Sequence, residues 1–375
     1  MRHPQSGKAQ LYELLALAFG QSAAVQAFNR VARALDAAML HLLLPCSNYV
    51  DDYPLIAPTA VADDTMSTAV ALMELLGWHV KEAGQLAASP KFKVLGVMID
   101  MARANTENAI YVANKPERVA EDRAMLSSMI ESNRATPALA RRLRGRLQYA
   151  SSQTFGRSGA FAARLMRDLA SAKGGERRLT FDEALAARWW HEYLGRASPR
   201  KVRLMPELPP VLVLTDGAVE EYASVGGILY DPVTKLFEYF GARVPDRVAE
   251  SWGRHCGKEQ VIGQAEIAPM VLAALIWRDA LQYRQTLVVV DNDSAKDAAV
   301  RGYSPSLPSA FLVAALWQAF AAAGADPWFD RVPGPSNLAD GPSRLEFQLL
   351  SSLGAKQRKI EDTHWERVKA PAVQS

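Results

Sequence analysis

Apolar positions recur every three to four residues along much of the first 200 residues, which is the period of an amphipathic helix. This pattern predicts helices over residues 24–43 and 65–76 and a bundle of two or three helices over residues 115–171. Residues 47–55 indicate an extended hairpin, and residues 91–99 alternate apolar and polar positions as paired strands do. The first half should therefore combine a small α+β region with a helical bundle.

Residues 180–183, Thr-Phe-Asp-Glu, predict the start of one more helix, because a Thr and a Glu three positions apart can form a capping box. That helix should run through Trp189, Trp190 and Tyr193. A basic stretch with several prolines, residues 198–210, follows it, and the main domain boundary is expected there.

The second half is predicted to be an α/β domain. Residues 211–214 indicate a buried strand that ends in Thr215-Asp216-Gly217-Ala218, and residues 224–230 and 235–242 add two strands of a meander. The elements expected next are a long helix over 265–284, a strand over 287–290, helices near 294–301 and 309–323, a strand near 328–332 and a final helix after Asn337. This order predicts a mixed five-stranded sheet covered by helices on at least one face.

The composition fits a globular chain of more than one domain. With 375 residues, 49% of them hydrophobic and 22% charged, the chain is long enough for two or three domains and too apolar to stay disordered. Lysine and arginine number 43 against 40 acidic residues. Arginine clusters in the middle of the chain fit a polyanionic partner, and they fit a solvated helix face about equally well.

Two cysteines, Cys46 and Cys256, are too few for a disulfide framework. No N-terminal stretch resembles a signal peptide, and no apolar run has the length of a membrane span. The expectation is a soluble protein of a reducing intracellular compartment, cytoplasm or nucleus, with no membrane partner.

Four acidic residues of the second half are predicted at the ends of elements. Asp216 and Asp291 each follow an apolar strand, while Glu266 and Asp340 are expected in the first turns of their helices. A helix start favours negative charge by itself, so either helical acid alone would be interpreted as a capping residue. Together, the four carboxylates suit a pair of Mg²⁺ or Mn²⁺ ions, because two-metal phosphodiester hydrolysis needs a ring of acids.

Asp293 competes with Asp291 for the same role, since residues 291–293 read Asp-Asn-Asp. Asp291 is preferred because it touches the strand, and Asp293 is expected to be the N-cap of the next helix. Small residues beside the acids are expected to let a nucleic-acid backbone approach, although turns need small residues for other reasons too; they are Gly217, Ala218, Gly263, Ala265, Ala339 and Gly341.

The segments LVLTDGA, GQAEIA, VVVDNDSA and SNLADGPSR resemble, in order and context, the retroelement branch of type 1 ribonuclease H over residues 210–350. The resemblance implies a ribonuclease H-like fold and cleavage of the RNA strand of RNA/DNA hybrids, with two metal ions held by the catalytic acids Asp216, Glu266, Asp291 and Asp340. Many type 1 enzymes carry a His in the loop before the final Asn. Residues 331–336 here read Arg-Val-Pro-Gly-Pro-Ser, which bears on turnover rate more than on the reaction.

Residues 49–52, Tyr-Val-Asp-Asp, place two adjacent acids in an apolar hairpin, where they need solvent or a cation. In isolation a solvated turn explains them equally well. Together with FGQSAAVQAF at 19–28 and FKVLG at 92–96, this YVDD motif resembles successive palm motifs of reverse transcriptases. The resemblance implies that Asp51, beside Asp52, is a polymerase metal ligand.

The helical region 115–171, with FGRSG at 155–159, looks like the thumb and connection of DIRS or gypsy-like retroelement reverse transcriptases. Its basic residues are candidates for salt-sensitive contacts to nucleic acid, namely Arg141, Arg142, Arg144 and Arg157. The family also uses an aspartate on an earlier palm strand. Only 18 residues precede Phe19, and the sole acid among them is Glu13, so an N-terminally truncated protein with impaired polymerase activity is expected.

Four regions are expected: a partial palm at 1–105, a helical thumb and connection at 106–200, a ribonuclease H-like domain at 208–352 and a polar C-terminal tail at 353–375. The leading hypothesis is a retroelement reverse transcriptase and ribonuclease H protein that retains hybrid cleavage. Two alternatives stay open: a catalytically inactive remnant that binds nucleic acid, and a nuclease or integrase of related fold that acts on duplex DNA. The sequence does not indicate the oligomeric state.

Overall fold

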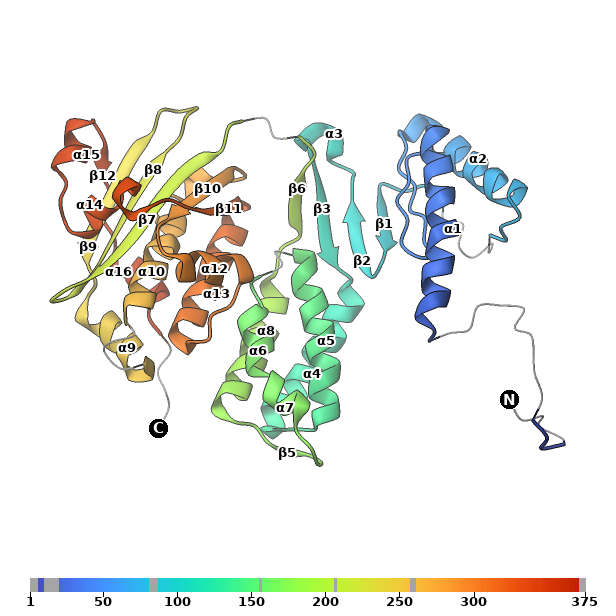
Figure 1. Ribbon diagram of the computed structural model, residues 1–375, viewed down its shortest axis with the longest axis horizontal. Helices are drawn as coiled ribbons and strands as arrows, with labels where there is room; N and C mark the ends of the chain where they lie inside the picture. Colours follow the sequence, from blue (N-terminus) through green and yellow to red (C-terminus); the bar gives the residue numbers. More distant parts are fainter. Residues whose placement is uncertain are drawn as a thin grey trace. The chain divides into compact units, whose positions relative to one another are not determined.

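The computed structural model, drawn in Figure 1, describes residues 6–9, 20–80, 87–154, 157–205, 208–256 and 261–370. The fold is a mixed α/β arrangement with several sheets, and the chain divides into two compact units, Met1–Pro90 and Lys91–Ser375. Phe19, Glu13 and the Phe155-Gly156 pair lie outside the described residues. Over the described ranges, no helix is long and apolar enough to cross a membrane.

The first unit contains two helices and a short hairpin. The helices α1 (Ser22–His41) and α2 (Ala62–Leu75) form where the helical period predicts them, and the turn η1 (Thr59–Val61) leads into α2. The hairpin is held by isolated antiparallel bridges, Cys46 to Leu55 and Tyr49 to Asp52, without a regular strand. The buried core of this unit consists of Leu35, Met39, Leu44 and Ala69.

The second unit begins with a four-stranded antiparallel sheet in the order β1-β2-β3-β6. The strands are β1 (Lys91–Val94), β2 (Val97–Asp100), β3 (Ala109–Asn114) and β6 (Arg200–Arg203), and the short helix α3 (Ala104–Glu107) precedes β3. β1 and β2 confirm the strand pair predicted within residues 91–99. β6 lies in the basic stretch expected to separate domains, so this sheet receives strands from both ends of the helical region.

Between β3 and β6 the chain forms a helical bundle, as the apolar period predicts (Figure 1). Its helices are α4 (Pro116–Ser132), α5 (Pro137–Thr154), α6 (Ala160–Leu165), α7 (Arg167–Ser171) and α8 (Phe181–Arg196). They enclose a core of their own that includes Leu143, Phe161 and Trp190. Gly159 is required before α6, because a Cβ there would overlap the indole ring of Trp190.

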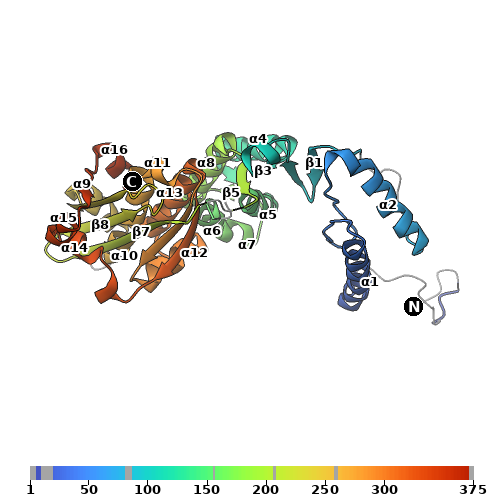
Figure 2. The same ribbon diagram turned by 90° about the horizontal axis from the view of Figure 1, so that it is seen from above.

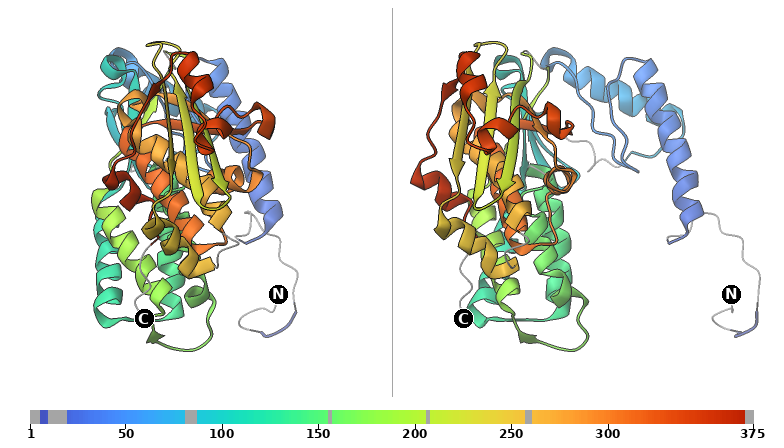
Figure 3. Two further views of the ribbon diagram at one scale, coloured as in Figure 1. Left: turned by 90° about the vertical axis from the view of Figure 1, so that its left-hand side faces the viewer. Right: turned by 60° about the vertical axis from the view of Figure 1, so that its left-hand side comes forward.

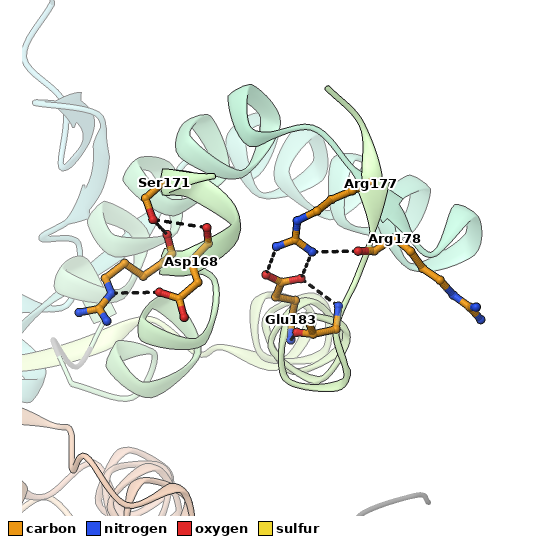
Figure 4. A network of polar contacts seen from close by, with 7 residues as sticks. Asp168, Ser171, Arg177, Arg178 and Glu183 are labelled. Atoms are coloured by element: carbon orange, nitrogen blue, oxygen red, sulfur yellow. Dashed lines mark hydrogen bonds and ion pairs between the residues drawn. The ribbon is translucent and has the colours of Figure 1, made fainter. Parts of the chain in front are cut away.

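A polar network fixes the start of α8 (Figure 4). The Glu183 N–H donates to Oγ1 of Thr180 (3.3 Å) and the Thr180 N–H donates to the Glu183 carboxylate (2.9 Å), which confirms the predicted capping box. The same carboxylate accepts two hydrogen bonds from Arg177, at 2.9 and 2.6 Å. Both arginines of β5 (Arg177–Arg178) pair through their backbone with β4 (Arg134–Ala135), but the Arg178 side chain points away from the network.

The remainder of the second unit is built on a mixed sheet in the order β11-β10-β7-β8-β9-β12. Its strands are β7 (Val211–Val219), β8 (Ala223–Tyr230), β9 (Phe237–Arg243), β10 (Gln285–Val290), β11 (Asp326–Arg331) and β12 (Lys356–Gln357). The meander of β7 to β9 is antiparallel, and β10, β11 and β12 join parallel to their neighbours. The expected count of five strands was wrong, because the two polar residues of β12 carry no apolar alternation.

Helical segments cover both faces of this sheet (Figures 2 and 3). In chain order they are α9 (Asp246–Cys256), α10 (Val261–Ile276), α11 (Arg278–Leu281), α12 (Asp293–Arg301), α13 (Leu307–Ala323), η4 (Gly334–Ser336), α14 (Asp340–Ser343), α15 (Gln348–Ser352) and α16 (Asp362–Arg367). The main core packs α10 and α13 against one face, around Val213 and Val288. A smaller core on the other face joins Leu214 and Val289 to Ala339 and Leu350.

Residues 353–370 are folded onto the sheet domain, although a polar tail was expected from residue 353. Trp365 and Val368 are buried in the main core. The carbonyl oxygen of Val368 accepts a hydrogen bond of 2.8 Å from Nε1 of Trp252. Charged residues between the apolar ones hide this contribution from a pattern-based prediction.

Candidate metal centre

Asp216 and Asp291 lie side by side because their strands are parallel neighbours. Val289 of β10 is in register with Leu214 of β7, and each acid lies two residues further along. The sequence placed Asp216 after its strand, but β7 continues to Val219 and pairs with β8 along that length. Asp216 is therefore buried inside the sheet, whereas Asp291 follows β10 directly and is partly exposed.

Glu266 reaches the same place from α10, because α10 packs closely on β7. A Cβ on Gly217 would overlap the carbonyl group of Ala265, so only glycine permits this approach. Glu266 is the sixth residue of α10, which begins at Val261, and not a first-turn residue as expected. Interaction with the helix start therefore does not account for a carboxylate that is only 8% exposed.

Asp216, Glu266 and Asp291 form a cluster in which one carboxylate oxygen of each lies within 4.8 Å of the others. Burial raises the pKa of Asp216 to about 6. A hydrogen bond from Ser343 lowers this pKa, and the charges of Asp291 and Asp340 raise it. Repulsion between neighbouring carboxylates thus adds to the cost of removing them from water.

Glu266 is the most perturbed member of the cluster. Burial raises its pKa to about 8, and the charges of Asp216 and Asp291 act in the same direction. Hydrogen bonds from the Asn292 side chain and the Gly217 backbone oppose the increase in pKa only in part. A cation among these oxygens would reverse the balance by favouring the ionised forms.

Two glycines on neighbouring strands leave room for α14 to pack on the sheet beside the cluster. Asp216 of β7, Gly226 of β8 and Gly241 of β9 are in register. A Cβ on either glycine would overlap the α14 backbone at Pro342 or Ser343. With α14 packed against these glycines, the Ser343 hydroxyl donates a hydrogen bond of 2.5 Å to Oδ2 of Asp216.

Asn337 fixes the segment that precedes α14. Its Nδ2 donates to the carbonyl oxygen of Thr215 (3.1 Å), and its Oδ1 accepts from the N–H of Ala339 (3.2 Å). The side chain is buried, so both hydrogen bonds are shielded from water. The Asn-Leu-Ala-Asp motif therefore ties the start of α14 to β7, directly beside Asp216.

Asp340 begins α14, as expected, but its carboxylate lies outside the three-acid cluster. Its side chain is 48% exposed, and its Oδ1 accepts a hydrogen bond of 2.9 Å from Nε of Arg344. Nη1 of Arg344 in turn lies 2.6 Å from Oε1 of Glu220. The structure thus brings three of the four expected acids together and places the fourth beside them in an ion pair.

Asp293 does not cap α12. The N-cap is Asn292, whose Oδ1 accepts from the N–H of Ala295 (3.0 Å), and Asp293 is the first residue of the helix. The expectation was wrong by one residue because Asn caps helices as well as Asp does. Asp293 is instead exposed and pairs with Lys296 at 3.1 Å and Arg331 at 3.3 Å.

Packing within the protein accounts for five of the six small residues beside the acids. Gly217 accommodates α10, and Ala218, Ala265 and Ala339 are buried. Gly341 lies against the carbonyl of Glu346. A Cβ on Gly263 would meet only Oγ of Ser309, at 3.9 Å, so packing does not require this glycine. The approach of a nucleic-acid backbone to these residues stays a prediction.

The Asp51-Asp52 pair lies at the turn of the hairpin in the first unit. Both residues are exposed, and Val50 before them has a φ of 56°, which is strained for a β-branched residue. Within the described ranges, no third acid, His or Cys joins them to make a metal-ligand group.

The basic residues singled out in the bundle differ in exposure. Arg142 and Arg157 are exposed, and Arg144 is half-buried. Arg141 is exposed too, but its Nη1 donates to the carbonyl oxygen of Ala170 at the end of α7 (3.0 Å). Arg141 therefore stabilises the bundle in addition to any contact with a polyanion.

The donor set of the cluster fits a divalent cation. It offers carboxylate oxygens alone, which are the ligands that Mg²⁺, Mn²⁺ and Ca²⁺ prefer. Two of the three carboxylates are buried and hold raised pKa values, as expected for acids gathered without a compensating charge. The cluster lies at the end of β10, beside α14 and Asn292, in the described part of the six-stranded domain.

No family model and no curated protein matches this chain. Solved structures do, at low identity. Ribonuclease H1 from the halophilic archaeon Halobacterium salinarum is 17% identical over 36% of this chain and 94% of its own, with a TM-score of 0.28. The N-terminal ribonuclease H domain of a Mycobacterium tuberculosis protein is 13% identical over 39% of this chain and 99% of its own, also with a TM-score of 0.28.

The foamy viral protease-reverse transcriptase solved with an RNA/DNA hybrid is similar over more of the chain. It is 13% identical over 96% of this chain, with a TM-score of 0.41. The present chain spans 42% of the length of that viral protein.

Proposed function

We propose that this chain is a divalent-metal-dependent nuclease of the ribonuclease H type that hydrolyses the RNA strand of RNA/DNA hybrids. The observation that carries the proposal is the cluster of Asp216, Glu266 and Asp291, in which three carboxylates from two strands and a helix converge within 4.8 Å. Two of them, Asp216 and Glu266, are buried and have raised pKa values, which is typical of acids at a metal-binding catalytic site.

Each residue of the site has a role that its position suits. Asp216, Glu266 and Asp291 would hold the cations, and Asp340 would complete the set from α14. Ser343 and Asn337 would keep Asp216 and α14 in register. Bound Mg²⁺ or Mn²⁺ ions, two in number, would supply an activated water and stabilise the leaving oxygen.

The test is cleavage of an RNA/DNA hybrid labelled on the RNA strand, in Mg²⁺ and in Mn²⁺. Asp216→Asn should lower cleavage by about 100-fold or more, because even residues that only support metal ligands are worth 10- to 100-fold. Asp293→Asn is the matched control, since Asp293 is a neighbouring acid outside the cluster. Equal cleavage by the parent protein and Asp216→Asn would refute the assignment, and preference for duplex DNA would favour a nuclease or integrase of another type.

For the rest of the chain we propose descent from a DIRS or gypsy-like retroelement reverse transcriptase. Residues 1–105 would correspond to a partial palm, residues 106–200 to the thumb and connection, and residues 208–352 to the nuclease domain. Asp51 and Asp52 are exposed and, within the described ranges, without a third carboxylate. Polymerase activity should therefore be weak or absent.

One observation favours a second candidate, a catalytically inactive protein that binds nucleic acid. Asp340 is engaged by Arg344 and not by the cluster. This candidate predicts that the protein binds the hybrid but does not cut it in either metal. The logarithm of its affinity should fall linearly with the logarithm of the salt concentration.

A further inference from the structure

Asp340 is the one acid of the four whose carboxylate is held by a cation in the described part of the chain. Its Oδ1 lies 2.9 Å from Nε of Arg344, and both side chains are about half exposed. Nη1 of the same arginine lies 2.6 Å from Oε1 of Glu220, so Arg344 stands between two carboxylates. Because water screens an exposed pair, the contact is weak and a stronger partner can replace it.

The backbone of Asp340 is nevertheless fixed beside the cluster. Ser343, on the same turn, donates to Asp216 at 2.5 Å, and its Oγ lies 2.8 Å from the carbonyl oxygen of Asp340. Gly226 and Gly241 lack the Cβ atoms that would keep the α14 backbone away from the sheet. The position of the Asp340 carboxylate is therefore a question of side-chain rotation, not of helix movement.

We propose that Arg344 is a positioning residue that holds Asp340 aside in the metal-free protein and releases it when a divalent cation binds to the three-acid cluster. Glu220 keeps the guanidinium in place after the exchange, since it remains as a partner. The affinity of the site for its cation is then set partly by the ion pair that must be broken. The inference rests on the proposed function only in taking the cluster as a metal site, and it does not depend on which nucleic acid is cut.

The test is calorimetric titration of the full chain with MnCl₂, without nucleic acid. Arg344→Gln removes the partner that holds Asp340, so the affinity for Mn²⁺ should rise about two- to fivefold, the range that an exposed ion pair contributes. Arg331→Gln is the matched control: Nε of Arg331 lies 3.1 Å from the carbonyl oxygen of Asp291, but the guanidinium pairs with Asp293 and with none of the four acids. It removes the same charge near the site and should change the affinity much less.

A double-mutant cycle separates release of Asp340 from a general effect of charge. In an Asp340→Asn background no carboxylate is left to release, so Arg344→Gln should cause no further gain in affinity. A gain of equal size in that background, or an equal gain from Arg331→Gln, would overturn the proposal, as would unchanged or weaker binding by Arg344→Gln. Thermal melting of each variant in EDTA verifies that the fold is retained.

The outcomes also distinguish this inference from the proposed function. Stronger Mn²⁺ binding by Arg344→Gln, in a protein that cuts no hybrid, would support the inference and refute the proposed cleavage of RNA/DNA hybrids. Hybrid cleavage that depends on Asp216, combined with parental Mn²⁺ affinity in Arg344→Gln, would refute the inference and support the function. A parent protein that binds no Mn²⁺ would refute both.

Discussion

At the scale of single residues, the burial of Glu266 links the candidate site to stability. Its pKa is raised from 4.5 to about 8 in the folded chain, mainly by burial. Between these values the folded state keeps a proton that the unfolded state has lost, so the free energy of unfolding should fall as pH rises through this window. The decrease is on the order of a few kcal/mol for one buried carboxyl group.

Glu266→Gln should remove this dependence, because a neutral amide has no proton to lose. Urea unfolding in EDTA at pH 5 and pH 8.5 measures it, and the variant should lose less stability than the parent between the two conditions. Parallel changes in both proteins would contradict the burial argument. Asp216, with its pKa raised to about 6, should produce the same kind of decrease, over the lower part of the window.

A second residue-scale prediction concerns the network at the start of α8. Glu183 is buried, and Arg177 is the cation that hydrogen-bonds to its carboxylate (Figure 4). Arg177→Gln should destabilise the protein by about 1–3 kcal/mol, because a buried carboxylate loses its compensating charge. Arg178→Gln removes the same charge one residue away, and its free energy of unfolding should stay within about 0.5 kcal/mol of the parent's. Equal effects in urea unfolding would show that net charge, not the pair, matters.

At the scale of elements, α14 is a helix of four residues that depends on the strands beneath it. Gly226→Ala would push a methyl group into the backbone at Ser343 and displace α14 from Asp216. Hybrid cleavage should fall by about 10-fold or more, in the range found for lost supporting contacts. Gly253→Ala in α9 meets no atom within 4 Å and serves as the control, since alanine there should slightly stabilise the helix. Unchanged cleavage by Gly226→Ala would show that α14 does not position the site.

Predictions from the sequence succeeded where local periodicity decides the structure. The helices α1, α2 and α8 and the strands β7 to β10 carry apolar positions at the spacing of their own type. Asp216 and Asp291 could be paired because each follows the apolar run of its strand, although β7 itself continues past Asp216. The strands β6 and β12 were missed, since their short polar segments become strands only by pairing with β3 and β9.

The parts of the site that the sequence does not reveal are contacts between distant segments. Ser343 and Asp216 are 127 positions apart, and the glycines that let α14 approach come from two further strands. Both Ser343 and Arg344 belong to the SNLADGPSR motif, but the motif alone does not indicate which distant residues they contact. The Arg344–Asp340 pair is local, since the two residues are four positions apart. The Arg344–Glu220 pair, in contrast, spans 124 positions and forms only once α14 is packed beside the end of β7.

At the scale of the whole molecule, the C-terminal segment completes the core on which the site depends. Trp365 is buried in the main core, which also contains α10, the helix that carries Glu266. The N–H of Ala370 donates to Oγ of Ser251 at 3.0 Å, so the segment is also fastened to α9. Residues 353–370 therefore support the six-stranded sheet domain, in contrast to the polar tail that the sequence predicts.

Trp365→Ala should accordingly destabilise the protein by about 3–5 kcal/mol, the usual cost of removing a large buried side chain. Glu366→Ala, at a neighbouring exposed position, should stay within about 0.5 kcal/mol of the parent in the same urea titration. A chain that ends at residue 352 should lose cleavage together with the cooperative unfolding transition of the sheet domain, because α10 loses part of its packing. If the shortened chain keeps the parent's cooperative unfolding transition and cuts the hybrid as fast as the parent does, the segment is a tail and the site is complete without it.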